Sequence, residues 1–386
     1  MTPLGRSDRT LIGRWFWTID RPLLAMVLVL VVIGLIAVAA ASPAAAFRYS
    51  GGSVRIDDLF YFKRQLFWVA VGVPLMLAVS MLSIASAKRL ALGGTLVFLA
   101  LLAAVPFIGF EVNGAIRWLS LGGFNIQPSE FLKPMFVVTT AWIMASRFDD
   151  GDVPALSVSL GMLVLVVAFL VVQPDFGQSA LFVAIWLVQA FLAGMSIATL
   201  GIAVGAGAAG LVAAYFTVPH VTSRIDRFLT GGGDTYQIDK ALDGFRAGGL
   251  FGAGPGEGQN KFSLPEPQTD YIFAVIGEEF GAIACAGIAI LFVAMVVRVL
   301  VQLLEEEDPF IVLAAAGLVA EIGGQAMINI GVNLNLLPSK GMTLPFISHG
   351  GSSFLALSIA MGLLLALTRR NRFLKASPYV PKRGAA

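Results

Sequence analysis

Charged residues are scarce in this sequence. Lys, Arg, Asp and Glu make up 13% of the 386 residues, whereas a soluble domain carries roughly 25%. So few charges cannot cover a surface that faces water on all sides. Hydrophobic residues make up 57% of the chain and come in blocks of about the 20 residues that span a hydrocarbon core. The sequence therefore predicts an integral membrane protein.

Cysteine and histidine are almost absent. The single Cys285 excludes an intrachain disulfide and a cysteine-rich metal site, and two histidines exclude a His-rich one. There is no Walker motif and no His-Glu-x-x-His, and the glycines of 254–258 do not follow a predicted strand, which excludes a dinucleotide site. No basic run with interleaved aromatics suggests nucleic acid as a partner.

The apolar blocks predict an all-α polytopic protein with about ten transmembrane helices. The first block is longer than the h-region of a signal peptide, about 7–15 residues, which favours a retained helix over a cleaved one. We expect one transmembrane domain over 23–368, with tails at 1–22 and 369–386. The predicted spans are 23–41, 61–80, 90–108, 129–146, 154–172, 178–194, 198–218, 271–300, 310–335 and 350–368.

The basic residues orient these spans, because Lys and Arg in short connections gather on the cytoplasmic side. One side of the predicted topology carries fourteen of them, and we expect it to face the cytoplasm with both termini: Arg6, Arg9, Arg14, Arg21, Lys88, Arg89, Arg147, Arg298, Arg369, Arg370, Arg372, Lys375, Lys382 and Arg383. The short loops of the other side carry six: Arg48, Arg55, Lys63, Arg64, Arg117 and Lys340.

The longest connection, 219–270, lies on the outer side between the seventh and eighth spans. Asp234 with Gln237 forms a capping box, and two glycines at 248–249 supply a stop. Between them runs an apolar stripe, which predicts a short helix in the outer interface. The stripe consists of Ile238, Ala241, Leu242 and Phe245.

A first group of polar residues precedes the fourth span. Glu130 and Lys133 are three residues apart and share a helix face, so they can pair. For Glu130, a structural ion pair and a functional role are equally supported. Arg117 and Lys133 favour a lipid phosphate, which Arg grips in bidentate fashion. Asp175 favours a capping role at the next outer turn.

Asp270 stands where the long outer loop meets the eighth span. A carboxylate there serves equally well as a helix N-cap or as a general base. The small residues Ala274, Gly277 and Gly281 lie on the same stripe, leaving room for a cavity or for a close-packed neighbour. A helix N-terminus would lower the pKa of Asp270 and apolar surroundings would raise it.

Other polar residues fall within the predicted spans or at the last outer turn. At least one of the two glutamates at 278–279 should face the interior and find a partner, and Glu321, Gln325 and Asn329 form an inward stripe of buried hydrogen bonds. Prolines and glycines break the helical pattern over 337–353, which is tolerated only inside protein or beside a water-filled cavity. The predicted cavity-lining residues there are Lys340, Ser348, Ser352 and Ser353.

These outer motifs resemble the SEDS proteins (shape, elongation, division and sporulation), and the division type more than the elongation type. The resembling stretches follow the family's order over nearly the whole chain: 63–65, 113–133, 173–177, 236–237, 248–258, 264–281 and 337–353. The resemblance implies a peptidoglycan glycosyltransferase that polymerises lipid II at the outer face of the bacterial inner membrane during septal synthesis. It also implies a class B penicillin-binding protein (an FtsI-type transpeptidase) and other divisome membrane proteins as partners.

The resemblance also assigns residues. The family's essential Asp falls on Asp270, its Pro-Glu on Glu266 and its loop Arg on Arg117. Its Gln-Pro-Ser-Glu-x-x-Lys motif supplies Gln127, Ser129, Glu130 and Lys133. His349 replaces the family's usual Tyr and could gain charge near neutral pH, and Gln268 stands where His is common.

In the implied reaction Asp270 is the general base, and Arg117, Lys133 and Lys340 neutralise the leaving pyrophosphate. A divalent cation, Mg²⁺ or Mn²⁺, would share that task, but no ligand set in the sequence identifies one. Two other functions stay open: a lipid II flippase, and a non-catalytic scaffold that activates the penicillin-binding protein.

Overall fold

The structure, a computed structural model, describes residues 10–50, 55–112, 115–122, 124–149, 151, 153–217, 222, 226, 236–338 and 341–369. It is predominantly helical, as predicted. Its helices are α1 (Leu11–Thr18), α2 (Arg21–Tyr49), α3 (Phe60–Ser80), α4 (Ile84–Ile108), α5 (Pro128–Asp149), α6 (Ala155–Val172), α7 (Phe176–Leu192), α8 (Ile197–Thr217), α10 (Tyr236–Gly248), α11 (Ile272–Leu303), α12 (Pro309–Asn333) and α13 (Gly351–Leu367), with one 3₁₀ turn, η1 (Asn260–Phe262).

Each of the ten predicted spans coincides with one helix, α2 to α8 or α11 to α13. Within the described residues, seven of these helices are long and apolar enough to cross a membrane: α2, α3, α4, α6, α8, α11 and α12. The helices α7 and α13 are apolar but shorter. The number of crossings and the side on which the termini lie stay predictions.

The outer connection after α4 contains a small sheet that the sequence analysis did not predict. Its antiparallel order is β1 (Phe110–Val112), β2 (Ala115–Leu121) and β3 (Phe124–Ile126), with Leu119 opposite Ile126. Two of the strands have three residues, too few to show an alternating pattern. The sheet packs on α4 and α5 through β2.

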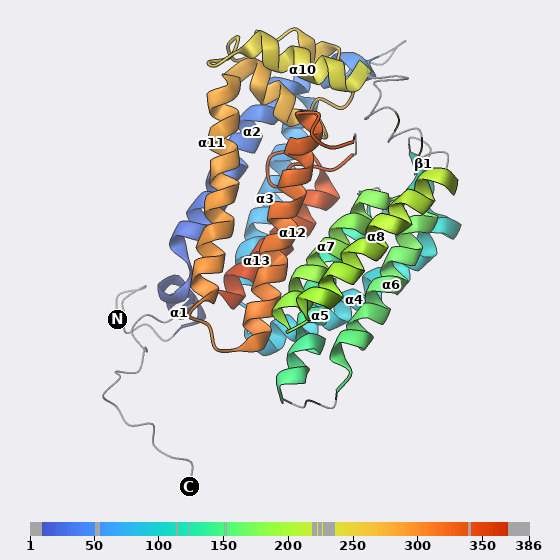
Figure 1. The fold of residues 1–386 in the computed structure, drawn as a ribbon. Coiled ribbons are helices and arrows are strands. Elements are labelled where there is room, and N and C mark those ends of the chain that lie inside the picture. The colour runs from blue at the N-terminus through green and yellow to red at the C-terminus, as the bar shows by residue number, and fades with distance from the viewer. Residues whose placement is uncertain are drawn as a thin grey trace.

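Contacts between chain ends and turns define the predicted cytoplasmic end of the bundle. The Trp15 indole donates to Ser80 Oγ (2.8 Å), and Arg298 pairs with Asp20 (2.6 Å). The Arg369 guanidinium donates to the Leu82 carbonyl. In Figure 1, α1 lies at this end, while α10 and β1 lie at the opposite one.

The helix α5 occupies the interior of the bundle. It packs against α4, α6, α7, α12 and α13, and Leu132, Phe136 and Val137 are fully buried. Figure 1 shows α4 to α8 on one side and α2, α3, α11, α12 and α13 on the other. The polar start of α5 is therefore brought to the junction between the two groups.

The predicted helix of the outer loop is confirmed as α10, although Asp234 of its proposed capping box lies outside the described residues. It packs on α11, and a Cβ on Gly248 would lie 2.0 Å from the carbonyl oxygen of Gly277. At Gly281 (φ 82°) the helical conformation of α11 is interrupted, and the amide of Ala282 donates to the carbonyl of Gly249 (2.9 Å). The small stripe below Asp270 thus accommodates a close-packed neighbour.

Candidate active site

Asp270 lies just outside the first turn of α11, whose N-cap is Tyr271. Its backbone carbonyl accepts from the side-chain amides of Asn329 (3.0 Å) and Asn333 (2.9 Å), both on α12. Its half-buried carboxylate lies against Gly341, where an added Cβ would approach Oδ2 to 2.9 Å. Within the described part of the chain, this carboxylate makes no hydrogen bond or ion pair. The backbone of Asp270 is therefore fixed, while its carboxylate is not engaged by any residue that the structure describes.

The electrostatic surroundings of Asp270 favour its neutral form. Burial raises the pKa of the carboxyl to about 7, and the negative charge of Glu266 adds to the rise. Of the two opposing influences on this pKa, the apolar surroundings win over the helix N-terminus. A carboxyl with a pKa near 7 is suited to general base catalysis at neutral pH.

Glu266 is held by its neighbours, in contrast to Asp270. Its carboxylate accepts from the Tyr49 hydroxyl, from Gln268 Nε2 (3.0 Å) and from Thr269 Oγ1 (3.0 Å). The backbone of Glu266 has φ 52°, a positive value that residues other than glycine seldom adopt. These bonds fix the turn that leads to Asp270.

The serines after α12 join this turn to the rest of the outer end. Ser348 Oγ donates to the carbonyl of Thr269 (2.6 Å), and Ser352 Oγ donates to the carbonyl of Asn125 (2.8 Å). Ser353 Oγ bonds Thr343 Oγ1 (2.6 Å). The three serines are buried and their hydroxyls are engaged within the protein, whereas Lys340 lies outside the described residues. Their predicted contact with substrate stays a prediction.

His349 does not carry the charge that the sequence analysis considered. Burial, together with the positive charge of Arg64, lowers the pKa of its imidazole to about 4, so the ring is neutral at neutral pH. Nδ1 lies 3.1 Å from Gln65 Oε1, and the ring stands edge-on to Tyr61. This histidine therefore acts as a hydrogen-bonding packing residue.

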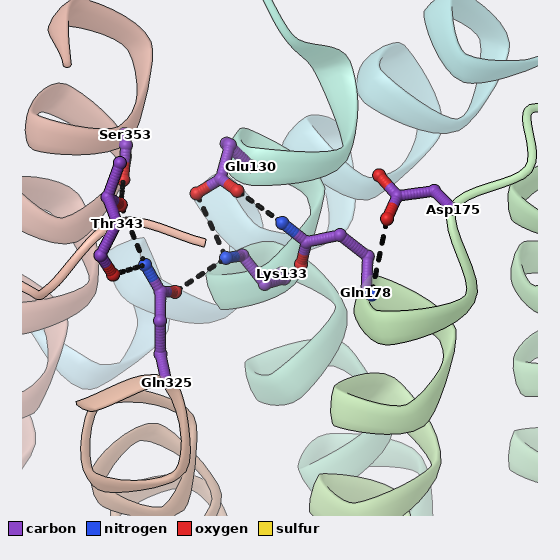
Figure 2. A network of polar contacts seen from close by, with 7 residues as sticks. All are labelled: Glu130, Lys133, Asp175, Gln178, Gln325, Thr343 and Ser353. Atoms are coloured by element: carbon purple, nitrogen blue, oxygen red, sulfur yellow. Dashed lines mark hydrogen bonds and ion pairs between the residues drawn. The ribbon is translucent and has the colours of Figure 1, made fainter. Parts of the chain in front are cut away.

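Lys133 is fully buried in a polar network that crosses the bundle (Figure 2). Its ammonium donates to Glu130 Oε2 (2.9 Å) and to Gln325 Oε1 (2.7 Å). Gln325 Nε2 donates to Thr343 Oγ1 (3.1 Å), and Gln178 donates to the other oxygen of Glu130. The predicted pairing of Glu130 with Lys133 is confirmed. In this conformation the ammonium does not reach solvent, and contact between Lys133 and a lipid phosphate stays a prediction.

Arg117 fastens β2 to the turn between α6 and α7. Its guanidinium donates to the carbonyls of Gln173 (3.2 Å) and Pro174 (2.7 Å) and lies 3.8 Å from Asp175 Oδ2, while 22% of its side chain stays exposed. Asp175 is the N-cap of α7, as predicted.

The remaining predicted polar residues are buried, except for Gln127, which is half-buried. Ser129 is buried, and the Gln127 carbonyl accepts from the amide of Glu130 (3.1 Å). The two glutamates of α11 both find partners: Glu278 accepts from the amide of Lys261 (2.9 Å), and Glu279 pairs with the Lys261 ammonium.

Sequence reasoning missed Asn333, although a signal was present. The polar stripe of Glu321, Gln325 and Asn329 continues at the same spacing of four residues to Asn333. The stripe does face the interior, and all four side chains are buried. Its outer end is where it contacts Asp270.

The described residues do not fit a metal ion held by the protein alone. No three His, Cys, Asp or Glu side chains among them are close enough together to bind one.

Known proteins are similar to this chain over nearly its whole length. The model of the FtsW/RodA/SpoVE family, described as cell cycle proteins, matches residues 21–373. A probable peptidoglycan glycosyltransferase FtsW from Caulobacter vibrioides is 44% identical over 95% of this chain and 93% of its own length. The stage V sporulation protein E of Bacillus subtilis is 35% identical over 92% of this chain and 98% of its own.

Solved structures share the fold. The crystal structure of the rod shape determining protein RodA from Thermus thermophilus is 26% identical, with a TM-score of 0.66 over 91% of this chain and 96% of its own. A peptidoglycan synthase complex that coordinates polymerization and crosslinking contains a chain with a TM-score of 0.75, at 24% identity over 91% of this chain and 97% of that one. The latter likeness concerns the fold alone.

Proposed function

This chain belongs to the FtsW/RodA/SpoVE family of cell cycle proteins, and we propose that it is a peptidoglycan glycosyltransferase whose reaction centres on Asp270. Relatives that align over nearly the whole chain are named as probable enzymes of that kind. The substrate that suits the activity is lipid II, a disaccharide-pentapeptide on undecaprenyl pyrophosphate. The observation that carries the proposal is the carboxylate of Asp270, which has no partner among the described residues and whose pKa is raised to about 7.

The proposed step is a displacement at the anomeric carbon of the donor. The 4-hydroxyl of the acceptor GlcNAc loses its proton to the Asp270 carboxylate as its oxygen bonds to that carbon. The bond from the carbon to the phosphate oxygen breaks, and undecaprenyl pyrophosphate leaves with the electron pair. No second acid is needed, because a pyrophosphate leaves without protonation.

Cations on the outer side would stabilise the charge that grows on the pyrophosphate. Of the predicted cations that the structure describes, Arg117 keeps part of its side chain exposed, whereas Lys133 is enclosed. We therefore assign phosphate contact to Arg117 ahead of Lys133.

The test is glycan synthesis from purified lipid II by the protein together with its partner transpeptidase. Asp270→Asn preserves the size of the side chain and removes its basicity, so we expect glycan strands to disappear. The matched control is Asp57→Asn, which alters an exposed carboxylate paired with Lys63 on the predicted outer side and should leave synthesis intact. Near-normal synthesis by Asp270→Asn would show that the base is another group.

The proposal extends to place and partners. The chain is an integral membrane protein of bacteria, and the outer clustering of its polar residues supports a reaction centre on the periplasmic face of the inner membrane, at the division septum. A class B penicillin-binding protein is the expected partner, since it would crosslink the strands produced here. Labelling of single cysteines at both ends of the bundle in intact cells tests the orientation.

The flippase and scaffold alternatives make different predictions. A flippase requires a polar route through the bundle, whereas the buried groups around Lys133 are hydrogen-bonded to one another. Lipid II translocation without any polymerisation would favour the flippase. Growth supported by an inactive Asp270→Asn variant would favour the scaffold.

A further inference from the structure

The first turn of α11 is hydrogen-bonded to a different helix. The helix begins at Ile272, so the amide of Ala274 is one of the first amides, which have no i−4 partner within a helix. The amide of Ala274 donates to Asn333 Oδ1 (3.1 Å) and to the carbonyl of Tyr271 (3.1 Å). The carbonyl of Asp270 accepts from Asn333 Nδ2 (2.9 Å). The carboxamide of Asn333 therefore bridges the amide of Ala274 and the carbonyl of Asp270.

This arrangement supplies the helix cap from a different helix. A helix begins with amides that lack partners, and the side chain of the N-cap residue commonly accepts from the second or third of them. Here the third amide belongs to Ala274, and the N-cap Tyr271 makes no side-chain cap bond. Asp270 directly precedes this N-cap, and aspartate is among the preferred capping residues, so its carboxylate is a local candidate for the vacant role. Asn333 performs this role in its place.

Asn329 strengthens the same support. Its amide donates to the carbonyls of Asp270 (3.0 Å) and of Met342 (2.6 Å), the neighbour of Gly341. It thereby ties the turn that bears the carboxylate to the segment against which the carboxylate lies. Both asparagines are buried on the rigid helix α12, at 1% and 0% exposure.

We propose that Asn333, assisted by Asn329, is a positioning residue that caps α11 in place of Asp270 and so leaves the Asp270 carboxylate free to accept the proton of the acceptor hydroxyl. This inference rests on the proposed function, since it explains how the base is kept available. It assigns no contact with substrate to either asparagine.

Removal of the Asn333 carboxamide should let Asp270 take over the vacant cap. Hydrogen bonds from backbone amides and the helix dipole favour the ionised carboxylate, so its pKa would fall. The carboxylate would also turn away from the acceptor, and a displacement of about 1 Å costs roughly 100-fold in rate. Among the described residues, Glu266 is the charged group that acts on Asp270, and it is unchanged in this variant.

The experiment measures kcat, KM and the pH profile of glycan synthesis from lipid II, with the full-length protein and its partner. We expect Asn333→Ala to lower kcat by about 100-fold with little change in KM, and to move the ascending limb of the pH profile to lower pH. Asn333→Gln retains a carboxamide and should recover part of kcat. Asn329→Ala leaves the cap in place and should show the same changes to a smaller extent, which keeps the test available if Asn333→Ala does not fold.

The matched control is Gln189→Ala. This buried carboxamide also donates to two main-chain carbonyls, those of Val137 (2.8 Å) and of Leu313 on α12 (3.2 Å), and neither acceptor belongs to α11. It should lower thermal stability while leaving kcat and the pH limb unchanged.

Three outcomes separate the hypotheses. Unchanged kcat and pH limb in Asn333→Ala, with Asp270→Asn inactive, would overturn the positioning role and leave the proposed function standing. Equal losses in Asn333→Ala and Gln189→Ala without a shift of the pH limb would reduce Asn333 to a structural residue. An active Asp270→Asn would remove the proposed function itself.

Discussion

Two polar regions lie along the same face of α12, and they treat their buried groups in opposite ways. Around Gln325, hydrogen bonds connect the side chains of Glu130, Lys133, Gln178, Gln325, Thr343 and Ser353, including both charges of the Glu130–Lys133 pair. Around Asn329 and Asn333, the backbone of Asp270 is held while its carboxylate is left without a partner in the described residues. The closed network indicates where stability lies, whereas the half-buried carboxylate of Asp270, which has no partner among the described residues, indicates where chemistry takes place.

The largest effect is expected when the closed network around Lys133 is broken. Lys133→Met leaves Glu130 buried without its cation, and we expect it to lower the free energy of unfolding by about 3–5 kcal/mol. Thermal unfolding of the protein in detergent or nanodiscs measures the loss. The double variant Glu130→Gln with Lys133→Met removes both charges and should recover much of the stability.

The same variants decide the role of Lys133. If the closed network is structural, variant protein that folds will keep the wild-type KM for lipid II. A large rise in KM at wild-type stability would instead show that the lysine binds the lipid phosphate.

A smaller effect is expected at His349. Because the folded pKa of this imidazole is lowered to about 4, the unfolded chain binds more protons below its ordinary pKa of about 6.5. Stability is therefore fully present above about pH 6.5 and falls, by about 1 kcal/mol per pH unit, as the pH drops toward 4. His349→Tyr removes this dependence, and unfolding measured between pH 4 and 8 reveals the difference. An equal slope in both proteins would mean that His349 is not the group responsible.

The smallest effect is expected from Glu266, whose negative charge acts on the Asp270 carboxyl. The Asp270 carboxyl must be ionised to act as a base, so glycan synthesis should rise with pH through about 7. Glu266→Gln removes the neighbouring negative charge and should move this limb to lower pH. The shift is limited because burial is the larger cause. At pH 7 the gain in the ionised fraction amounts to at most about twofold. If the ascending part of the pH profile is the same in Glu266→Gln and in the wild type, the charge of Glu266 does not influence the pKa of Asp270.

Much of the fold followed from local patterns. Each of the ten apolar blocks coincides with a helix, because a hydrocarbon core of fixed thickness requires an apolar run of about 20 residues. The predicted ends differ from the observed ones by up to eight residues, as at α2, which ends at Tyr49 and not at 41. Polar residues within these blocks could also be predicted to face the interior of the bundle, since a polar group in the membrane requires a partner. The sheet at 110–126 was missed because its strands are short and are stabilised by packing on α4 and α5.

The sequence predicted which residues belong to the candidate site better than it predicted which of them contact one another. The pattern around Asp270 allowed a cap and a base with equal support, and the sequence could not decide because the competing acceptor, Asn333, lies 63 residues away on another helix. Lys133 was predicted to pair with Glu130 and to contact a lipid phosphate, but the sequence did not show its second partner, Gln325, which is 192 residues distant. Such contacts depend on which helices become neighbours.

By itself, the sequence determined that this chain forms helices long enough to span a membrane. It also indicated that the polar residues of its motifs gather at one end of the bundle. It did so because hydrophobic length and the scarcity of charge are local properties. Only the tertiary structure decided which carboxylates are satisfied. Glu130 is closed in by α5, α7 and α12, while Asp270 is spared because α12 supplies the cap that it would otherwise provide.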